Sequence, residues 1–382
     1  MQAKNIALVM KDDGGINNVL PICREYIQRG RNVKIFTNGR ANDRLKDSGL
    51  EFTPVETTEE FLLNCPNPDL LVTSMCSDGG VGRDLVPILR GSCPVVATQD
   101  YWGVRLVTEW SDPKFRPDYI TVNDQLGADL VLKAWPEFKA ENICQIGFPM
   151  FDSFGSINSQ KEKDARCEVR TKLQVHDRLP IIFFPCGVLI GASEMLDEVL
   201  SAVRYLIERD PVLERNLKFI PRVHPRLEKI APQEFKPWNN LLNRFNERFP
   251  GIVVFDESII RADIKILILA SDVVVSDYST TLLEAVLIGS KVNGKANISI
   301  MYPRPCQVEF RNEFGTLFDE PPFVTMECTA KAINQDHLRQ LLANSIVRDK
   351  LRLILKNYQV RCFPIDGRNT ERNVDFFETL IR

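Results

Sequence analysis

The sequence predicts an α/β protein built from two doubly wound domains, each a parallel sheet with helices on both faces. Three observations support this class. Short buried runs of β-branched and other apolar residues alternate with stretches of helical periodicity along the whole chain. A chain of 382 residues is too long for a single compact core. The two halves also share one coarse plan, in which a buried strand leads into a polar or glycine-bearing loop and then a helix.

The first half, residues 1–155, contains six predicted strands and the helices between them. The strands are the apolar runs at 5–10, 33–37, 52–55, 69–74, 94–98 and 119–122. Helices are predicted at 19–29, 41–48, 83–90 and 123–134. The polar segment 11–18 is predicted to be a loop at the carboxyl end of the first strand, where open parallel sheets bind ligands. It lacks the G-x-G-x-x-G pattern, which argues against a dinucleotide-dependent dehydrogenase.

A polar linker at 156–178, with a helix at about 161–173, leads to a second domain at 179–362. Its predicted strands are 179–185, 217–223, 252–255 and 273–275, and a further strand begins at residue 291. Helices are predicted at 193–209, 259–269, 280–288, 335–344 and 349–357, with Gly289 ending the third. A last amphipathic helix covers 370–382, within a terminal segment at 363–382.

Composition excludes several classes of protein. The net charge of −3 argues against a nucleic-acid binder. The ten cysteines form no C-x-x-C pair, so we expect reduced, mostly buried thiols and a cytoplasmic location. No apolar run reaches the ~18 residues of a membrane-spanning helix, whereas peripheral contact with the inner face of a membrane stays open. No metal-ligand cluster appears, and we expect neither a metal nor another cofactor.

The segment at 270–289 predicts a phosphate site. A buried strand at 273–275 runs into Ser276-Asp277-Tyr278-Ser279, and a helix follows. Ser279, Thr280 and Thr281 place hydroxyls and unbonded backbone N–H groups at the first turn of this helix, and such a turn suits an anion. Glu284 comes about one turn later, so it can point towards the same ligand.

Two other loops of the second half are predicted to join this site. A strand ends at Arg222-Val223-His224, where Pro225 stops the ladder and Arg226 follows. Arginine suits bidentate phosphate recognition, and histidine can donate to an oxyanion. The loop with Gly187 follows the first strand of this half, and it is either a simple turn or a place where the absence of a side chain lets a ligand phosphate approach the backbone.

The first half carries acidic and glycine residues directly after its strands. They are expected to line the site opposite the phosphate turn, on what is called the acceptor side below, and a carboxylate there can remove a proton from a hydroxyl group of a ligand. Asp13 and Asp100 are the candidates for this base, and His224 is the third candidate for a catalytic role. The other acceptor-side residues are Asp12, Gly14, Gly15, Asp78 and Gly79.

Several of these motifs resemble the GT-B glycosyltransferases. The turn S-D-Y-S-T-T-L-L-E-A-V-L-I-G is similar to the nucleotide-binding turn of these enzymes and of the related UDP-GlcNAc 2-epimerases. The H-P-R triplet and the D-G-R-N-T-E-R tail resemble those of CDP-glycerol glycerophosphotransferases. The resemblance implies a GT-B fold, two Rossmann-like domains facing each other across a cleft, with the last helix crossing back to the first domain. It also implies that Glu284 binds the ribose and that His224 contacts donor phosphate.

The resemblance further implies a metal-independent transferase that moves a sugar, or a polyol phosphate, from a nucleotide-activated donor to an acceptor hydroxyl. Surface-polysaccharide or glycoconjugate synthesis is the expected setting. A UDP-GlcNAc 2-epimerase is the first alternative, although S-D-Y-S-T-T replaces the glycine-rich D-S-G-G of that family. A non-catalytic nucleotide-binding protein of the same fold is the second. The acceptor, the nucleotide base and the formation of a homodimer stay open.

Overall fold

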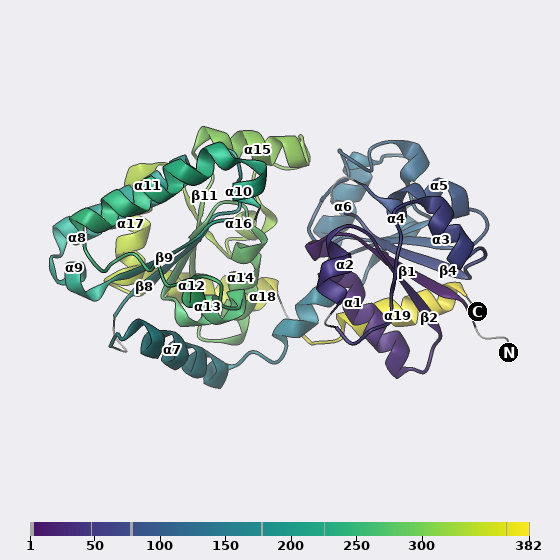
Figure 1. The fold of residues 1–382 in the computed structure, drawn as a ribbon, viewed down its shortest axis with the longest axis horizontal. Coiled ribbons are helices and arrows are strands. Elements are labelled where there is room, and N and C mark those ends of the chain that lie inside the picture. Colours follow the sequence, from purple (N-terminus) through teal and green to yellow (C-terminus); the bar gives the residue numbers. More distant parts are fainter. Residues whose placement is uncertain are drawn as a thin grey trace. The chain divides into compact units, whose positions relative to one another are not determined.

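The computed structural model describes residues 4–46, 48–76, 79–176, 179–224, 226–363 and 365–381. The chain divides into two compact units. The first unit comprises Met1–Gly155, Glu313–Phe318 and Asp366–Arg382, and the second comprises Ser156–Asn312 and Asp319–Ile365. Both units are parallel sheets covered by helices, so the predicted α/β class is confirmed (Figure 1).

Within the described residues, the sheet of the first unit has seven strands in the order β3-β2-β1-β4-β5-β6-β7. The direction of strand addition reverses between β1 and β4. The loops after these two strands therefore lie at the switch point, where doubly wound sheets bind ligands. The strands are β1 (Ile6–Met10), β2 (Val33–Thr37), β3 (Thr53–Pro54), β4 (Leu70–Ser74), β5 (Val95–Thr98), β6 (Tyr119–Val122) and β7 (Ile143–Gln145).

The first helix begins earlier than the sequence pattern predicts. Helix α1 (Asp13–Gln28) covers most of the segment 11–18, so the loop predicted there is wrong from residue 13 onward. The Asp12 side chain accepts the N–H of Gly15 at 2.9 Å and caps the helix. This cap, together with the burial of Ile16 and Val19, outweighs the low helix propensity of Gly14 and Gly15.

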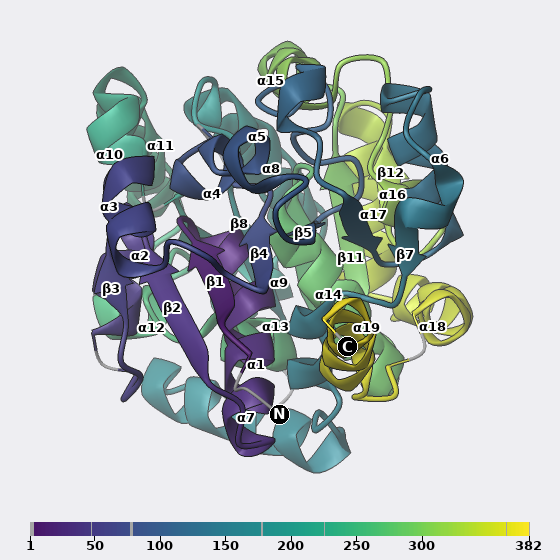
Figure 2. The same cartoon turned by 90° about the vertical axis from the view of Figure 1, so that its right-hand side faces the viewer.

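The last helix packs on the core of the first unit. Helix α19 (Asn369–Leu380) lies beside α1 on one face of the sheet, while α3, α4 and α5 cover the other face (Figures 1 and 2). Val374 and Phe377 are fully buried in the same apolar cluster as β1 and α1. Asp152 accepts the N–H groups of Asn369 and Thr370 at 2.9 and 2.7 Å, which caps α19. The remaining helices are α2 (Arg40–Leu45), α3 (Thr58–Asn64), α4 (Val81–Asp84), α5 (Val86–Leu89) and α6 (Gln125–Ala134).

The second unit has, in the part of the chain described, a five-stranded sheet in the order β12-β11-β10-β8-β9. Its switch point lies between β8 and β10, so the loops after these strands share one edge. The strands are β8 (Ile181–Pro185), β9 (Lys218–Arg222), β10 (Val273–Ser276), β11 (Ala296–Ile300) and β12 (Ala330–Ala332). The predicted strand at 252–255 is wrong, because that segment contributes one isolated bridge, from Val253 to Phe219.

Gly289 does not end its helix, and the strand predicted from residue 291 is also wrong. Helix α14 (Thr280–Lys291) continues past the glycine, and β11 begins at Ala296. A Cβ atom at Gly289 would lie 2.0 Å from Oε1 of Gln359. The glycine therefore permits close packing of α18 against α14, which is a tertiary requirement and not a stop signal.

Helices cover both faces of the second sheet. Helix α8 packs on α11 and α17, whereas α13 packs on α7 and α14, and α14 on α18. The helices of this unit are α7 (Ser159–Leu173), α8 (Ala192–Arg209), α9 (Val212–Asn216), α10 (Leu227–Ile230), α11 (Pro232–Arg248), α12 (Glu257–Ile260), α13 (Ile264–Ala270), α14, α15 (Arg304–Phe314), α16 (Pro322–Thr325), α17 (Gln335–Ile346) and α18 (Lys350–Cys362). The end of α15, from Glu313 onward, belongs to the first unit.

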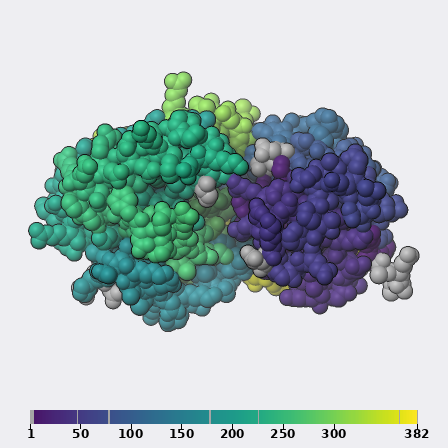
Figure 3. All heavy atoms as spheres, viewed as in Figure 1, coloured from purple at the N-terminus to yellow at the C-terminus, as the bar shows by residue number. Residues whose placement is uncertain are grey.

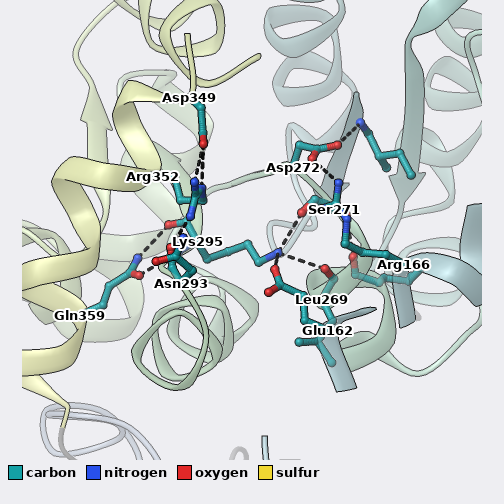
Figure 4. Close-up of polar contacts among 12 residues, drawn as sticks. Glu162, Arg166, Leu269, Ser271, Asp272, Asn293, Lys295, Asp349, Arg352 and Gln359 are labelled. Carbon is teal, nitrogen blue, oxygen red and sulfur yellow. Dashed lines mark hydrogen bonds and ion pairs between the residues drawn. The ribbon is translucent and has the colours of Figure 1, made fainter. Parts of the chain in front are cut away.

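A buried lysine ties α7 to the amino edge of this sheet (Figure 4). Lys295 is 2% exposed, and its Nζ donates to the carbonyl oxygens of Ser271 and Leu269 at 2.9 and 3.1 Å. Glu162 of α7 lies 3.5 Å away. Lys295 therefore satisfies carbonyls at the C-terminal end of α13 and lines a polar cavity of about 370 Å³. In Figure 3 the atoms of α7 (teal) form the lower margin of the second unit.

The lowered pKa of Lys295 predicts that the wild type and a variant without this amine differ in stability by an amount that depends on pH. Burial lowers the pKa of Lys295 to about 8, and Glu162 and Asp272 oppose that shift. Between this value and the ordinary lysine pKa, the unfolded chain binds more protons than the folded chain, so stability rises with pH. Relative to Lys295→Met, the wild-type free energy of unfolding should gain ~2 kcal/mol between about pH 8 and 10 and stay parallel to the variant below that window. Urea titrations across this range measure it, and parallel curves throughout contradict it.

Candidate functional site

Three loops meet at the carboxyl edge of the second sheet, because β10, β8 and β9 are neighbours. Pro185 is in register with Arg222, and Val274 is in register with Phe183. The segments that follow carry Gly187, His224 and Ser279. The structure thus brings together the three segments that the sequence predicts as one site.

Asp277 holds two of these loops together. It is fully buried, and its Oδ2 accepts the N–H groups of Gly187 and Val188 at 2.6 and 3.0 Å. Its Oδ1 accepts the N–H of Ser279 at 2.7 Å. Burial raises the pKa of Asp277, and these three hydrogen bonds oppose the rise. One carboxylate therefore fixes the loop after β8 against the first residue before α14.

The loop after β8 is closely packed. A Cβ atom at Gly187 would lie 2.6 Å from Oδ1 of Asp277 and 3.0 Å from Cβ of Ser279. The N–H of Gly187 donates to Asp277, so a phosphate can receive it only if that bond breaks. The next two N–H groups are also occupied, since Val188 donates to Asp277 and Leu189 donates to Glu309. In this structure the loop binds the protein's own carboxylates.

The N-terminus of α14 is capped and still presents donors. Ser279 Oγ accepts the N–H of Thr281 at 3.2 Å, and Oγ also lies 3.3 Å from Thr281 Oγ1. Among the described residues, the N–H of Thr280 has no hydrogen-bond acceptor, and Thr280 is exposed. The positive end of the helix macrodipole lies at the same turn. The Thr280 N–H is thus the donor that this turn leaves open, whereas the Thr281 N–H is used by the cap, and the anion site at Ser279, Thr280 and Thr281 stays a prediction.

Glu284 lies one turn further along α14. Its Oε2 is buried and has no hydrogen-bond partner among the described residues. Burial raises the pKa of Glu284 to about 7, and Lys265 and Arg222 oppose the rise. A buried carboxylate oxygen without a donor costs free energy. It therefore suits a ligand hydroxyl that can supply the missing hydrogen bond.

The raised pKa of Glu284 predicts that both the free energy of unfolding and the affinity for a nucleotide depend on pH. Its folded pKa lies above the unfolded value, so its favourable contribution is complete below the unfolded value and is lost as pH rises through about 7. Relative to Glu284→Gln, the wild type should lose ~2 kcal/mol of unfolding free energy between about pH 5 and 7. Thermal melts across this range measure the difference. If a ligand hydroxyl donates to Glu284, nucleotide affinity should rise over the same window; an affinity that falls contradicts this role.

The strand end at β9 brings two cationic side chains and one imidazole to this edge. His224 Nδ1 accepts the N–H of Arg226 at 3.1 Å, which assigns the ring hydrogen of neutral His224 to Nε2. Arg222 donates from Nη1 to the carbonyl of Ala262 at 2.8 Å, and burial lowers its pKa. Arg226 is half-buried, and its Nε has no partner among the described residues. Pro225 lies outside the described residues.

In the first unit, Asp100 lies against the first turn of α1. A Cβ atom at Gly14 would lie 1.6 Å from Oδ2 of Asp100, so only glycine permits this approach. Burial and the neighbouring Asp12 raise the pKa of Asp100 to about 7, whereas Arg105 opposes the rise. A carboxyl with a pKa near neutrality can accept a proton and release it again. Asp100 therefore stays a candidate for the general base.

Arg105 is the cation beside this carboxylate. Its guanidinium lies 3.5 Å from Glu109 and 3.4 Å from Glu313. Its φ of 61° lies in the left-handed region, which costs a non-glycine residue conformational free energy. No local motif in the sequence marks Arg105. Asp100 and Glu109 are close to it in the chain, but its partner Glu313 comes from a distant segment that folds back onto the first unit.

The other acceptor-side candidates are placed differently from Asp100. Asp13 is half-exposed and pairs with Arg40 at 2.9 Å, so its carboxylate is directed towards α2. Gly15 is buried, and a Cβ atom there would lie 2.2 Å from Oγ of Ser74. Gly79 has a φ of 64°, and a Cβ atom there would meet the Arg83 guanidinium. Asp78 lies outside the described residues.

Asp277 is the second residue to which sequence reasoning assigned no role. It stands in the S-D-Y-S segment, between a buried strand and a capped helix. The sequence does hold a signal for this role, because Asp277 is an acidic residue directly after a buried strand and two positions before an N-cap. Glu309 on α15 had no such signal, because its partner Leu189 is 120 residues away.

Solved structures with the same fold include three kinds of protein. A UDP-GlcNAc 2-epimerase from Methanocaldococcus jannaschii has a TM-score of 0.63 at 13% identity, over 98% of this chain and 99% of that chain. A glycosyltransferase from Rickettsia africae has a TM-score of 0.63 at 12% identity, over 100% of both chains. The wall teichoic acid polymerase TagF has a TM-score of 0.60 at 14% identity, over 100% of this chain and 90% of that chain.

These similarities show that the chain has the GT-B fold, as the sequence resemblance predicts. No protein-family model and no curated protein matches the sequence. At 11–14% identity the likeness extends to the fold and not to the reaction.

Proposed function

We propose that this protein is a metal-independent glycosyltransferase, which moves a sugar or a polyol phosphate from a nucleotide-activated donor to an acceptor hydroxyl. The observation that carries the proposal is the first turn of α14, with the unpartnered Glu284 oxygen one turn later. A diphosphate needs several hydrogen-bond donors, and a ribose needs an acceptor for its hydroxyl. This helix offers both on adjacent turns.

The proposed chemistry assigns one task to each group. Ser279, Thr280 and the dipole of α14 stabilise the negative charge that develops on the leaving group, which is a nucleoside diphosphate when a sugar is transferred and a nucleoside monophosphate when a polyol phosphate is transferred. Arg222 and His224 supply further donors at the same edge of the sheet. Asp100 is the proposed base for the acceptor hydroxyl, and a base of this kind contributes ~10²–10⁴-fold to the rate.

Release of nucleotide from activated donors tests the proposal. The protein is incubated with UDP-, CDP-, GDP- and dTDP-linked sugars and with CDP-glycerol, and the freed nucleotide is measured. We expect release from one nucleotide class, and Thr280→Ala should reduce it by ~10-fold through one lost charge-assisted hydrogen bond. No release from any donor, with or without added acceptor alcohols, contradicts a transferase.

The epimerase alternative rests on the fold similarity to UDP-GlcNAc 2-epimerases. The same assay separates the two, because an epimerase converts UDP-GlcNAc into UDP-ManNAc and releases no nucleotide at steady state. Interconversion without net release of UDP replaces the transferase proposal with an isomerase.

A further inference from the structure

Helix α18 carries an exposed aliphatic face. Leu353, Ile354 and Val360 are 53%, 58% and 49% exposed, and Val347, just before the helix, is 58% exposed. The opposite face is buried, since Leu355 and Gln359 pack towards α14 and β11. Apolar side chains on both sides of a helix indicate that the outer side meets a second apolar medium.

Helical spacing gathers the exposed side chains of α18 on one side of the helix. Positions 350, 354, 357 and 361 follow one another at intervals of three or four, with 353 and 360 directly beside them. Val347 and Arg348 lie in the turn that precedes the helix. This side of the helix therefore contains Leu353, Ile354 and Val360 together with the polar Asn357, and the cations Lys350 and Arg361 lie at its two ends. The term α18 face is used below for Val347, Arg348, Lys350, Leu353, Ile354, Val360 and Arg361.

The charge of the α18 face is opposite in sign to that of the chain. The whole chain has a net charge of −3, yet the α18 face carries three exposed cations. The nearby carboxylate of Asp349 pairs with Arg352 at 2.8 Å. Glu327 accepts a hydrogen bond from Tyr358 and keeps its charge. The three exposed cations outnumber this one carboxylate, so the face is locally basic.

We propose that the α18 face lies on an anionic lipid surface, with its aliphatic side chains at the acyl boundary and its cations among the headgroup phosphates. A helix that carries exposed aliphatic side chains between cations at its two ends has the pattern of an interfacial helix. A second copy of the chain is a poorer occupant, because a two-fold contact would place Lys350 and Arg361 against the same cations. Among the described residues no helix is both long and apolar enough to cross a membrane, so the proposed contact is peripheral.

Vesicle co-sedimentation tests the proposal. The full chain is mixed with phosphatidylcholine vesicles, with or without phosphatidylglycerol. We expect binding to the anionic vesicles only, and weaker binding as salt is raised. Lys350→Glu with Arg361→Glu should lower the affinity by ~10-fold or more, and Leu353→Ser with Ile354→Ser by ~10-fold.

A matched control removes exposed aliphatic side chains elsewhere. Leu63 and Val212 are 83% and 65% exposed and lie on α3 and α9. The double variant Leu63→Ser with Val212→Ser should bind anionic vesicles like the wild type. Light scattering of each variant reports its oligomeric state, and thermal melts report its folding. Equal binding by the wild type and both α18 variants overturns the proposal. A wild-type dimer that Leu353→Ser with Ile354→Ser dissociates, without vesicle binding, assigns the face to a second copy instead.

Discussion

Replacing Asp277 with alanine should lower the free energy of unfolding by ~4 kcal/mol and abolish nucleotide binding. The change removes a buried carboxylate and leaves the N–H groups of Gly187, Val188 and Ser279 without an acceptor. Each unsatisfied buried donor costs ~1–3 kcal/mol. The loop after β8 is then no longer fixed against the N-terminus of α14, so the anion-binding turn loses its shape. Urea denaturation measures the stability, and calorimetry with nucleoside diphosphates measures the binding.

A matched control separates a local role from a general effect of losing an aspartate. Asp256 caps α12 and accepts the N–H of Ser258 at 2.8 Å in an exposed position. Asp256→Ala should cost only ~1 kcal/mol and leave nucleotide binding intact. If Asp277→Ala unfolds at the same urea concentration as Asp256→Ala, then Asp277 does not hold the two loops together.

Replacing Gly14 with alanine should displace Asp100 and remove most of the proposed activity. The new Cβ atom would occupy the position of the Asp100 carboxylate, 1.6 Å from its Oδ2. A carboxylate moved towards solvent should have a lower pKa than about 7, because burial is the main cause of the present value. We expect kcat to fall by ~10²–10⁴-fold, as for loss of a general base. Carboxyl-carbon NMR titration of Asp100 reports the displacement independently of any activity.

The control for Gly14 is a glycine at which an added methyl group meets a much milder contact. Gly155 has a φ of −57°, and the nearest atom to an added Cβ is the carbonyl oxygen of Asp152 at 3.1 Å, so a small shift accommodates the methyl group. Gly155→Ala should leave the titration of Asp100 unchanged. An unchanged Asp100 pKa in Gly14→Ala would show that the carboxylate does not depend on this glycine. A lowered pKa with full activity would keep the geometry and reject Asp100 as the base.

The strands were predictable because their signal is local. Buried parallel strands are continuous apolar runs, and Tyr119–Val122 was predicted with the bounds that β6 has. Glycine misled the prediction where its role is tertiary. Gly14 and Gly289 both lie within helices, where they let Asp100 and Gln359 approach the backbone. Such contacts join residues far apart in the sequence, so no local pattern reveals them.

The candidate site was likewise predictable only where its signal is local. Ser279, Thr280 and Glu284 could be proposed because a strand, a turn and a helix follow one another along the chain. Asp277 lies within the same motif, but its role could not be predicted, because its hydrogen-bond partner Gly187 is 90 residues away. Asp13 and Asp100 look equivalent in sequence, and only the structure separates the surface ion pair of Asp13 from the buried position of Asp100.

The central claim is that the N-terminus of α14 binds the diphosphate of a nucleotide, and calorimetry tests it most directly. The wild type, Ser279→Ala with Thr280→Ala, and Glu284→Gln are titrated with UDP, CDP, GDP and dTDP. We predict that one nucleotide binds the wild type, that the double variant weakens it by ~10–100-fold, and that Glu284→Gln weakens it less. No binding by any of the four, or equal binding by the wild type and the double variant, would contradict the claim.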